Sequence, residues 1–220
     1  MMKNKEYIQN KQKQSNHFNI SNIEVIVKNP LANNVSARET VTRLTNIVPK
    51  KLLGNIKGIN IGSHRELEKR ELQALYKDST IYVTNIQKSN EDLLDDLVHE
   101  VAHSVEEMYS DHIYGDKRLE SEFLTKRKEL WRLIRDRGFK MELNKFLDPL
   151  YSKEFDLFLY KGVGYPLLAA ISSNIFYSPY AATSLREYFA NGFESFFLKE
   201  ETYRLKKISP ILYQKIQNLL

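Results

Sequence analysis

An amphipathic helix is the strongest structural signal in the sequence. Ser89 followed three residues later by Asp92 is typical of a helix N-terminus, where a side chain caps the backbone of the first turn. Five apolar residues then recur at helical spacing: Leu94, Val98, Val101, Val105 and Met108. The pattern predicts a helix over residues 89–110 whose apolar stripe is buried.

The middle of this predicted helix carries the string His99-Glu100-Val101-Ala102-His103. Residues four apart share one helix face, with Cβ atoms about 5–6 Å apart, so both imidazoles can reach one ion at the Zn–N distance of about 2.0–2.1 Å. Glu100 is rotated from that axis by about a third of a turn, so it can approach the open side of the metal without binding it. It can there take a proton from water whose pKa zinc lowers to near 7. The string predicts a hydrolytic zinc centre with Glu100 as the general base, although two histidines on one helix face also occur as ordinary core or surface residues.

A catalytic zinc site needs a third protein ligand, with the fourth position left for water. No third histidine follows at the spacing of the longer zinc motifs, because position 109 is Tyr, so a carboxylate from a later helix is expected. The other candidates are expected to point away along the same helix, to lie in a turn or to lie on solvated faces: Glu106, Glu107, His112, Glu120, Glu122, Glu129 and Glu142.

Glu187 differs from these residues because it lies in a predicted helix, residues 184–198, that is too apolar for a surface element. Ser184 and Glu187 also form a capping box, in which the Glu187 side chain would only bond the backbone N–H of Ser184. On spacing alone, both roles of Glu187 remain open.

The strings HEVAH and YAATSLREYFANGF together resemble the motifs of the anthrax lethal factor-like zinc metallopeptidases, a group that includes small bacterial Pro-Pro endopeptidases. In the second motif of that family, a tyrosine stands seven residues before a zinc-binding glutamate, and Tyr180 and Glu187 match these positions. The resemblance implies a zincin-like (gluzincin) fold and one Zn²⁺ per chain, bound by His99, His103 and Glu187. It also implies that the Tyr180 phenol donates to the oxyanion of the tetrahedral intermediate.

The function implied by the resemblance is that of a zinc-dependent endopeptidase acting on a protein or peptide substrate. In such enzymes an edge strand pairs with the extended substrate through main-chain hydrogen bonds. Residues 81–85 are the strand expected in that role, and an internal strand is the alternative. Two rival functions are a catalytically weak or inactive zincin-fold binding module and a basic nucleic-acid-binding protein.

Two features depart from the family pattern. Asn191 stands where the relatives have an acidic residue, and loss of a carboxylate that orients a metal-bound group typically lowers affinity or activity by about 10–100-fold. A lower metal affinity, or service by another acid, is therefore expected. The spacing from His103 to Glu187 is also longer, which predicts a helical insertion over about residues 112–175, either a substrate-selecting lid or a structural elaboration. Tyr177 lies ten residues before Glu187, off the spacing of the catalytic tyrosine.

The wider pattern predicts an α+β fold with a small mixed sheet in the N-terminal part and an α-rich remainder. Strands are expected over residues 23–28, 59–61 and 81–85, and helices over 36–48, 65–76, 117–147, 184–198 and 210–220. Residues 161–179 are punctuated by Gly, Ser and Pro and are expected to be loop-rich. Residues 1–20 are expected to form a flexible N-terminal arm, and residues 21–220 a single zinc metallopeptidase domain.

Composition excludes several classes of site. The 220 residues contain no cysteine, so disulfides, thiolate nucleophiles and Cys-bound metals are excluded. No apolar stretch reaches the length of about 18 residues that a membrane span needs, and the N-terminal residues lack the apolar core of a secretory signal. The expected location is the cytoplasm of the producing cell, or outside it after export by an unrecognised route.

The net charge of +5 is mild and favours solubility over an acidic partner. The strongest basic run lies within residues 122–136 and alternates with acidic residues. Its basic members are Lys126, Arg127, Lys128, Arg132 and Arg135. Because the charges alternate, a solvated helix face is expected there rather than a nucleic-acid site.

Overall fold

The computed structural model describes residues 16–198 and 202–220. Packing divides the chain into two compact units, residues 1–108 and 109–220. Helix α4 (Asn90–Tyr114) runs across this boundary and departs from helical geometry at Tyr109, where φ is −121° and ψ is 23°. The boundary between the units therefore coincides with a local break in α4.

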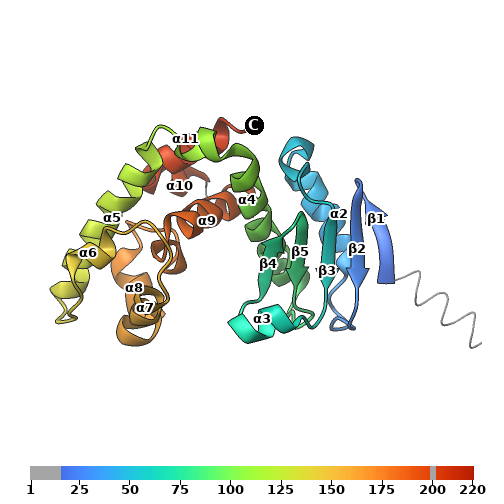
Figure 1. Ribbon diagram of the computed structural model, residues 1–220, viewed down its shortest axis with the longest axis horizontal. Helices are drawn as coiled ribbons and strands as arrows, with labels where there is room; N and C mark the ends of the chain where they lie inside the picture. The colour runs from blue at the N-terminus through green and yellow to red at the C-terminus, as the bar shows by residue number, and fades with distance from the viewer. Residues whose placement is uncertain (1–15, 199–201) are drawn as a thin grey trace, which may run out of the picture. The chain divides into compact units, whose positions relative to one another are not determined.

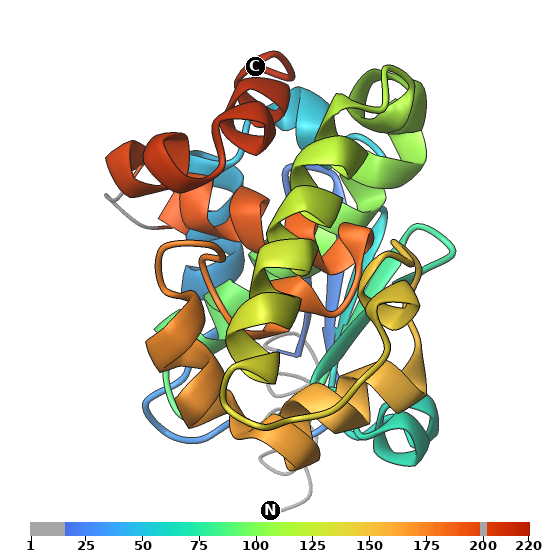
Figure 2. The same cartoon turned by 90° about the vertical axis from the view of Figure 1, so that its left-hand side faces the viewer.

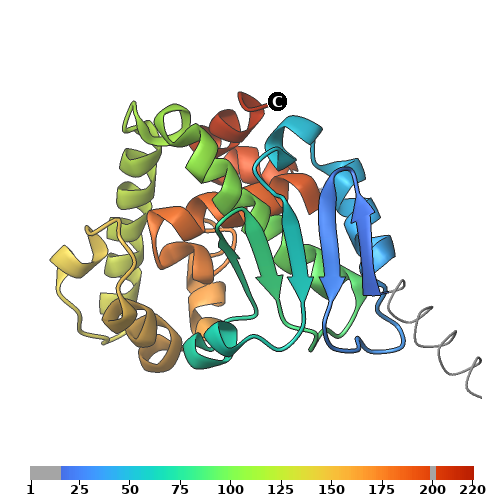
Figure 3. The same ribbon diagram turned by 45° about the vertical axis from the view of Figure 1, so that its right-hand side comes forward.

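The first unit contains a five-stranded mixed sheet (Figures 1 and 3). Its strands are β1 (His17–Ile20), β2 (Ile23–Val27), β3 (Gly58–Ile61), β4 (Ala74–Lys77) and β5 (Thr80–Val83), in the spatial order β1-β2-β3-β5-β4. The three central strands are parallel, whereas β1 and β4 are antiparallel edges. Each edge is joined to its neighbour by a two-residue turn with positive φ at both positions, as in a type I′ hairpin.

Alternating apolar side chains form the core of this unit. Val25, Ile59 and Ile81 are directly opposite one another on the three central strands, and all three are fully buried. Helix α2 (Ala37–Ile47) and helix α4 lie behind the sheet in Figure 3, and α3 (Arg65–Arg70) and the 3-10 turn η1 (Lys50–Leu53) complete the unit. Four of the five predicted stripe residues on α4 are buried, and Met108, at 38% exposure, is the exception.

The predicted strands of this unit and the helix over residues 36–48 are confirmed within two or three residues at each end. The helix expected over residues 65–76 is wrong in its second half. It ends as α3 at Arg70, because Glu71 adopts a left-handed φ of 56°, and the next apolar residues pair with β5 as strand β4. Strand β5 is consequently internal, so the expectation of an edge strand at residues 81–85 is also wrong.

The expected arm over residues 1–20 is too long. Residues 17–20 form strand β1, which pairs with β2 through the hairpin, and residues 1–15 lie outside the described part of the chain.

The second unit is helical. Its long helices α5 (Arg118–Arg135) and α9 (Leu185–Leu198) pack against each other and against α11 (Pro210–Gln217), as Figure 2 shows. The shorter elements are α6 (Leu143–Phe146), α7 (Lys153–Leu157), the π-helix η2 (Phe158–Gly164), α8 (Tyr165–Ser172), the 3-10 turn η3 (Tyr180–Ala182) and α10 (Thr202–Ile208). The α+β class is thus confirmed, with a small mixed sheet followed by a helical C-terminal part. A single metallopeptidase domain over residues 21–220 stays a prediction.

The loop-rich segment expected over residues 161–179 is wrong up to residue 172, because η2 and α8 occupy most of it. Gly164 takes a φ of 88° between the two elements, and Pro166 sits in the first turn of α8, where its missing N–H costs no helical hydrogen bond. The Gly and Pro residues mark a helix boundary here rather than a loop.

The solvated face expected for the basic run is wrong at two positions. Lys126 and Arg127 are buried on the face of α5 that also buries apolar residues. Helix α5, from the predicted insertion, therefore contributes to the core of the second unit. Among the described residues, no helix has the length and apolar character needed to cross a membrane.

Candidate metal centre

His99 and His103 lie one turn apart on α4, as the sequence predicts. The preceding cap is present, because the Asp92 N–H donates to the Ser89 hydroxyl at 3.1 Å. The two imidazole centroids are 5.1 Å apart and the rings are nearly perpendicular, at 79°. Two imidazoles at this separation on one helix face can converge on a single ion.

Glu106 holds the ring of His103. Its Oε2 lies 2.6 Å from His103 Nδ1, and the Glu106 side chain is buried. Because an ionised carboxylate can only accept, Nδ1 carries the proton and Nε2 becomes the nitrogen suited to bind a metal. The expectation that Glu106 points away is therefore wrong. The spacing of three residues on one helix was a signal that could have identified this pair.

Glu100 is buried beside strand β4. Its Oε2 accepts the backbone N–H of Tyr76 at 2.5 Å. This bond orients the carboxylate, and a carboxylate has a second oxygen that can accept a proton. The side chain of Tyr76 also contacts α4, because its phenol donates to Glu107 Oε2 at 2.6 Å. The same phenol oxygen accepts from the Asn55 amide at 2.6 Å. Tyr76 thus joins the edge strand to two turns of the motif helix, a role that the sequence analysis missed.

Asp96 is a buried acid one turn before the motif. Burial raises its pKa from 3.8 to about 6, against the effect of a 2.9 Å hydrogen bond that it accepts from the Gln87 amide. Asp92 and Glu100 raise the pKa further, whereas His99 lowers it. The negative charge at Asp96 is therefore unfavourable in the folded protein at neutral pH.

Glu187 lies in the first turn of α9. The Ser184 hydroxyl accepts the backbone N–H of Glu187 at 3.2 Å, so the predicted cap is present. This bond uses the backbone of Glu187. The competing role, in which the Glu187 carboxylate bonds the Ser184 N–H, stays a prediction.

One group of side chains among the described residues could hold a metal ion. It consists of His99, His103 and Glu187, and one donor atom from each lies within 4.8 Å of the others. These are the three residues that the resemblance implies as ligands. His112 and the other acidic candidates are not in the group.

Arg127 fixes the segment that leads into α9. It is 1% exposed, and its guanidinium donates to the carbonyl oxygens of Phe146 at 3.0 Å, Ala182 at 2.8 Å, Thr183 at 3.2 Å and Lys145 at 2.6 Å. The Leu185 N–H also donates to the Pro149 carbonyl at 2.8 Å. The backbone on the N-terminal side of Glu187 is therefore tied to α5 and to the segment after α6.

Tyr180 lies in η3, immediately before that backbone. Burial raises the pKa of its phenol well above the ordinary value, and the Glu187 carboxylate adds to the rise. The phenol therefore stays protonated at neutral pH and is a hydrogen-bond donor. Tyr177 is placed differently, because the Arg204 guanidinium lies over its ring, 4.8 Å from the centroid.

Asn191 is buried and accepts a short hydrogen bond from the Ser178 hydroxyl. That hydroxyl in turn accepts the N–H of Ala181 at 3.2 Å. The amide at this position therefore supports the segment that carries Tyr180.

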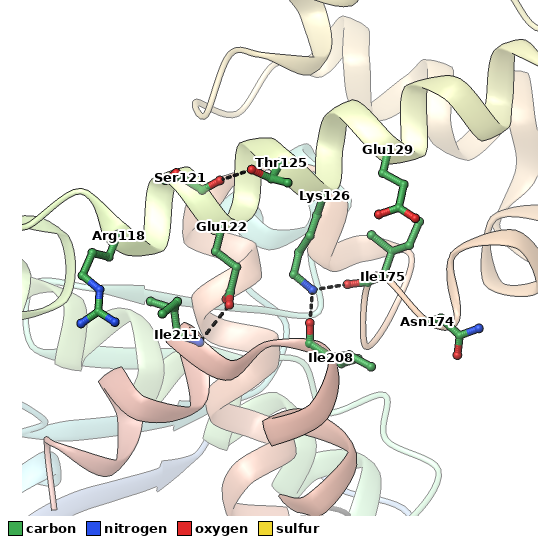
Figure 4. A pocket seen from close by; sticks show the side chains of 10 residues that line it. All are labelled: Arg118, Ser121, Glu122, Thr125, Lys126, Glu129, Asn174, Ile175, Ile208 and Ile211. Carbon is green, nitrogen blue, oxygen red and sulfur yellow. Dashed lines mark hydrogen bonds between the residues drawn. The ribbon is translucent and has the colours of Figure 1, made fainter.

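A cavity of about 490 Å³ lies elsewhere in the second unit (Figure 4). Two polar groups of its wall are bonded within the protein: Lys126 donates to the Ile175 carbonyl at 2.5 Å, and Glu122 accepts the N–H of Ile211 at 2.8 Å. Burial lowers the pKa of Lys126 to about 8. The lining includes Glu122 and Glu129, which the sequence analysis set aside as ligands, and none of the residues implied as ligands or catalytic groups.

Comparisons of the chain with protein-family models, with curated proteins and with solved structures find no match.

Replacing Asp96 by Asn should stabilise the metal-free protein at neutral pH. Because the folded-state pKa of about 6 lies above the ordinary 3.8, the native state binds more protons between these values, and stability falls as pH rises through this window. The gain in the free energy of unfolding at pH 7.5 should be about 1–2 kcal/mol, less than the full pKa shift would give, because Asp96 is partly exposed. The gain should vanish below about pH 4. Urea unfolding across this range measures it, with the exposed neighbour Asp95→Asn as the control. A pH-independent difference would contradict this account.

Glu106→Gln should weaken binding of a divalent metal, with Zn²⁺ as the probe, by about 10–100-fold, because the amide cannot hold His103 Nδ1–H as a carboxylate does. Competition with a chromophoric chelator measures the affinity. Glu107→Gln is a matched control, since Glu107 bonds Tyr76 instead of a histidine. Equal zinc affinities for both variants would remove Glu106 from this role.

Proposed function

We propose that this protein is a zinc-dependent endopeptidase with a zincin-like fold, related to the lethal factor-like metallopeptidases. The observation that carries the proposal is the group of His99, His103 and Glu187, whose donor atoms lie within 4.8 Å of one another. Two imidazole nitrogens and one carboxylate oxygen form a ligand set that catalytic zinc sites use, with a fourth position left for water. The donor set therefore fits Zn²⁺.

The residues around the ligands fit the chemistry of peptide hydrolysis. A bound zinc ion would polarise the scissile carbonyl and lower the pKa of its water to about 7. Glu100 accepts the proton of the attacking water and passes it to the leaving amine. The Tyr76 N–H holds this carboxylate in place. The protonated phenol of Tyr180 donates to the developing oxyanion.

The substrate in this proposal is an extended peptide. Strand β4 is the outer strand of the sheet and is antiparallel to β5. An exposed strand edge can add a peptide strand through main-chain hydrogen bonds. Because β5 is internal, β4 is the pairing strand of this proposal. The Tyr76 N–H is already bonded to Glu100, so the peptide would pair with the remaining outward main-chain groups of β4.

The structure gives less support to the two rival functions. An inactive binding module was suggested by Asn191, but Glu106 supplies a buried carboxylate to His103. A nucleic-acid site was suggested by the basic run, but Lys126 and Arg127 are buried and bonded to carbonyl oxygens.

The protein should bind about one zinc ion per chain, and chelation should lower its melting temperature, because the metal binds the folded state. Glu187→Ala should lose its zinc, because removal of a ligand should weaken zinc affinity by more than the roughly 10–100-fold that follows from loss of a ligand's hydrogen-bond partner. Elemental analysis after dialysis measures the content. Glu194→Ala, which changes another acid of α9, is the control. Unchanged zinc in Glu187→Ala would exclude Glu187 as a ligand.

Peptide cleavage should depend on Glu100 and Tyr180. Glu100→Gln should keep its zinc and lose about 10²–10⁴-fold in kcat, the range for general acid–base catalysis. Tyr180→Phe should keep its zinc and its KM but lose about 10²–10³-fold in kcat.

Initial rates on a peptide library, with zinc content measured in parallel, test both variants. Tyr177→Phe is the matched control and should cleave at the wild-type rate. A wild-type cleavage rate in Tyr180→Phe would exclude Tyr180 as the oxyanion donor. If the zinc-loaded wild-type protein cleaves nothing, the inactive binding module becomes the better account.

A further inference from the structure

The exposed face of α5 carries a line of cations that the proposed function does not use. Three of the five members of the basic run are exposed, namely Lys128, Arg132 and Arg135. They follow one another along the helix by four and then three residues, so they lie on one face of it. We call Lys128, Arg132 and Arg135 the basic stripe.

The charge of the basic stripe is not neutralised within residues 16–198 and 202–220. Elsewhere on the same helix Lys117 pairs with Glu120 at 2.9 Å, whereas none of the three stripe residues forms an ion pair with a described acid. Glu129 is turned about 100° from the first stripe residue and lines the cavity of Figure 4 instead. Asp136 is likewise turned about 100° from the last. The stripe therefore presents its positive charge to solvent.

Trp131 holds the guanidinium of Arg135 in place. The guanidinium carbon lies 4.5 Å from the centroid of the Trp131 ring, and the indole Nε1–H donates to the Met141 carbonyl at 3.0 Å. A guanidinium that stacks on an aromatic face can still bind a carboxylate along its edge through two parallel hydrogen bonds. Because the ring fixes Arg135 in advance, binding of such a group costs less side-chain entropy.

The helix that carries the stripe is itself fixed, because its opposite face is buried in the core of the second unit. Basic residues in the last turn of a helix interact favourably with its dipole, and this effect accounts for Arg132 and Arg135 without any partner. It does not account for Lys128, which precedes the last turn, since the effect falls off within one turn. The dipole therefore explains only part of the stripe.

The composition of this face distinguishes between anionic partners. A helix that binds a lipid surface inserts exposed apolar side chains, and no large hydrophobic residue between residues 118 and 140 is exposed. Single-stranded nucleic acid stacks its bases on aromatic rings, and Arg135 already covers one face of Trp131. Carboxylates need neither feature, because a guanidinium or ammonium group binds them directly.

We propose that the basic stripe is a docking surface for an acidic segment of a partner protein. The stripe spans about 10 Å, because each helical residue rises about 1.5 Å. An extended peptide covers this length with about three residues, and its alternate side chains share one side at a spacing of about 6.7 Å. Alternate Asp or Glu side chains of an extended segment therefore match the stripe. The inference does not rest on the proposed function, since no stripe residue belongs to the candidate metal centre.

Trp131 offers a direct readout, because it is the one tryptophan of the chain. Titration of the full-length protein with an oligoglutamate peptide should change the Trp131 emission at low ionic strength, and the change should saturate. High salt should weaken the binding, since salt screens exposed charges. An oligolysine peptide of the same length is the control and should leave the emission unchanged. An emission that oligoglutamate does not alter would overturn the proposal.

Fluorescence anisotropy of a labelled oligoglutamate peptide tests the three residues themselves. The triple variant Lys128→Gln, Arg132→Gln, Arg135→Gln should bind the peptide about tenfold more weakly at low ionic strength, the combined effect of three weak surface ion pairs. The loss should shrink at high salt.

A second triple variant removes the same charge from exposed lysines of the first unit: Lys50→Gln, Lys57→Gln and Lys69→Gln. This control should bind the peptide almost as wild type does. An equal loss of affinity in both triple variants would assign the binding to net charge alone and contradict a docking surface on α5.

An oligothymidylate strand and vesicles containing phosphatidylserine are the competing anionic probes. Both should bind more weakly than oligoglutamate at the same ionic strength. Tighter binding of either probe, lost in the stripe variant, would overturn the assignment of a protein partner and identify a nucleic acid or a membrane surface instead.

Discussion

The buried guanidinium of Arg127 organises the part of the second unit from which Tyr180 and Glu187 project. A cation this deeply buried is costly unless its N–H groups are satisfied. Here four backbone carbonyls and the face of Phe155 satisfy it. Burial lowers its pKa only to about 9, so the charge persists at neutral pH. Because two of the carbonyls come from within the predicted insertion and two from the turn after it, one side chain on α5 ties the turn before α9 to the segment that contains α6.

Helix α4 shows how a single periodicity can serve packing and chemistry at once. Its apolar stripe faces the core, and the polar residues between the stripe positions form the candidate centre. His103 follows His99 by four residues, and its ring lies beside that of His99. Glu106 follows His103 by three residues, and its carboxylate contacts the His103 imidazole. The helix therefore supplies two candidate ligands, the candidate base and one orienting carboxylate from a single short segment.

Local regularities made much of the fold predictable. The caps at Ser36, Ser89 and Ser184 and the apolar stripe of α4 are properties of short segments, and each is present in the structure. The candidate metal group was identifiable because two of its residues share a helix and the third belongs to the string on which the family resemblance rests. The predictions that were wrong concern features that depend on tertiary packing. Strand β4 forms because a hairpin pairs it with β5, and the periodicity of so short a segment does not predict this pairing.

Lys126 and Arg127 illustrate the same limit for charged residues. Alternating charges along a sequence predict a solvated helix face, but at two positions the carbonyls of distant segments replaced water as the hydrogen-bond partners. Tyr76 was missed for a similar reason, since its bonds to Glu100 and Glu107 need a strand that the sequence pattern did not indicate.

The departure at Asn191 has a physical explanation within the proposed function. An acid there would place a second buried negative charge one turn after Glu187, where only a metal or a cation could offset it. The amide instead accepts the Ser178 hydroxyl, and that hydroxyl accepts the Ala181 N–H, so the residue steadies the turn of Tyr180 without adding charge. The orienting carboxylate is found on α4, where Glu106 bonds His103 directly. Because Glu106 supplies a carboxylate to His103, the substitution at Asn191 does not by itself argue for a decayed site.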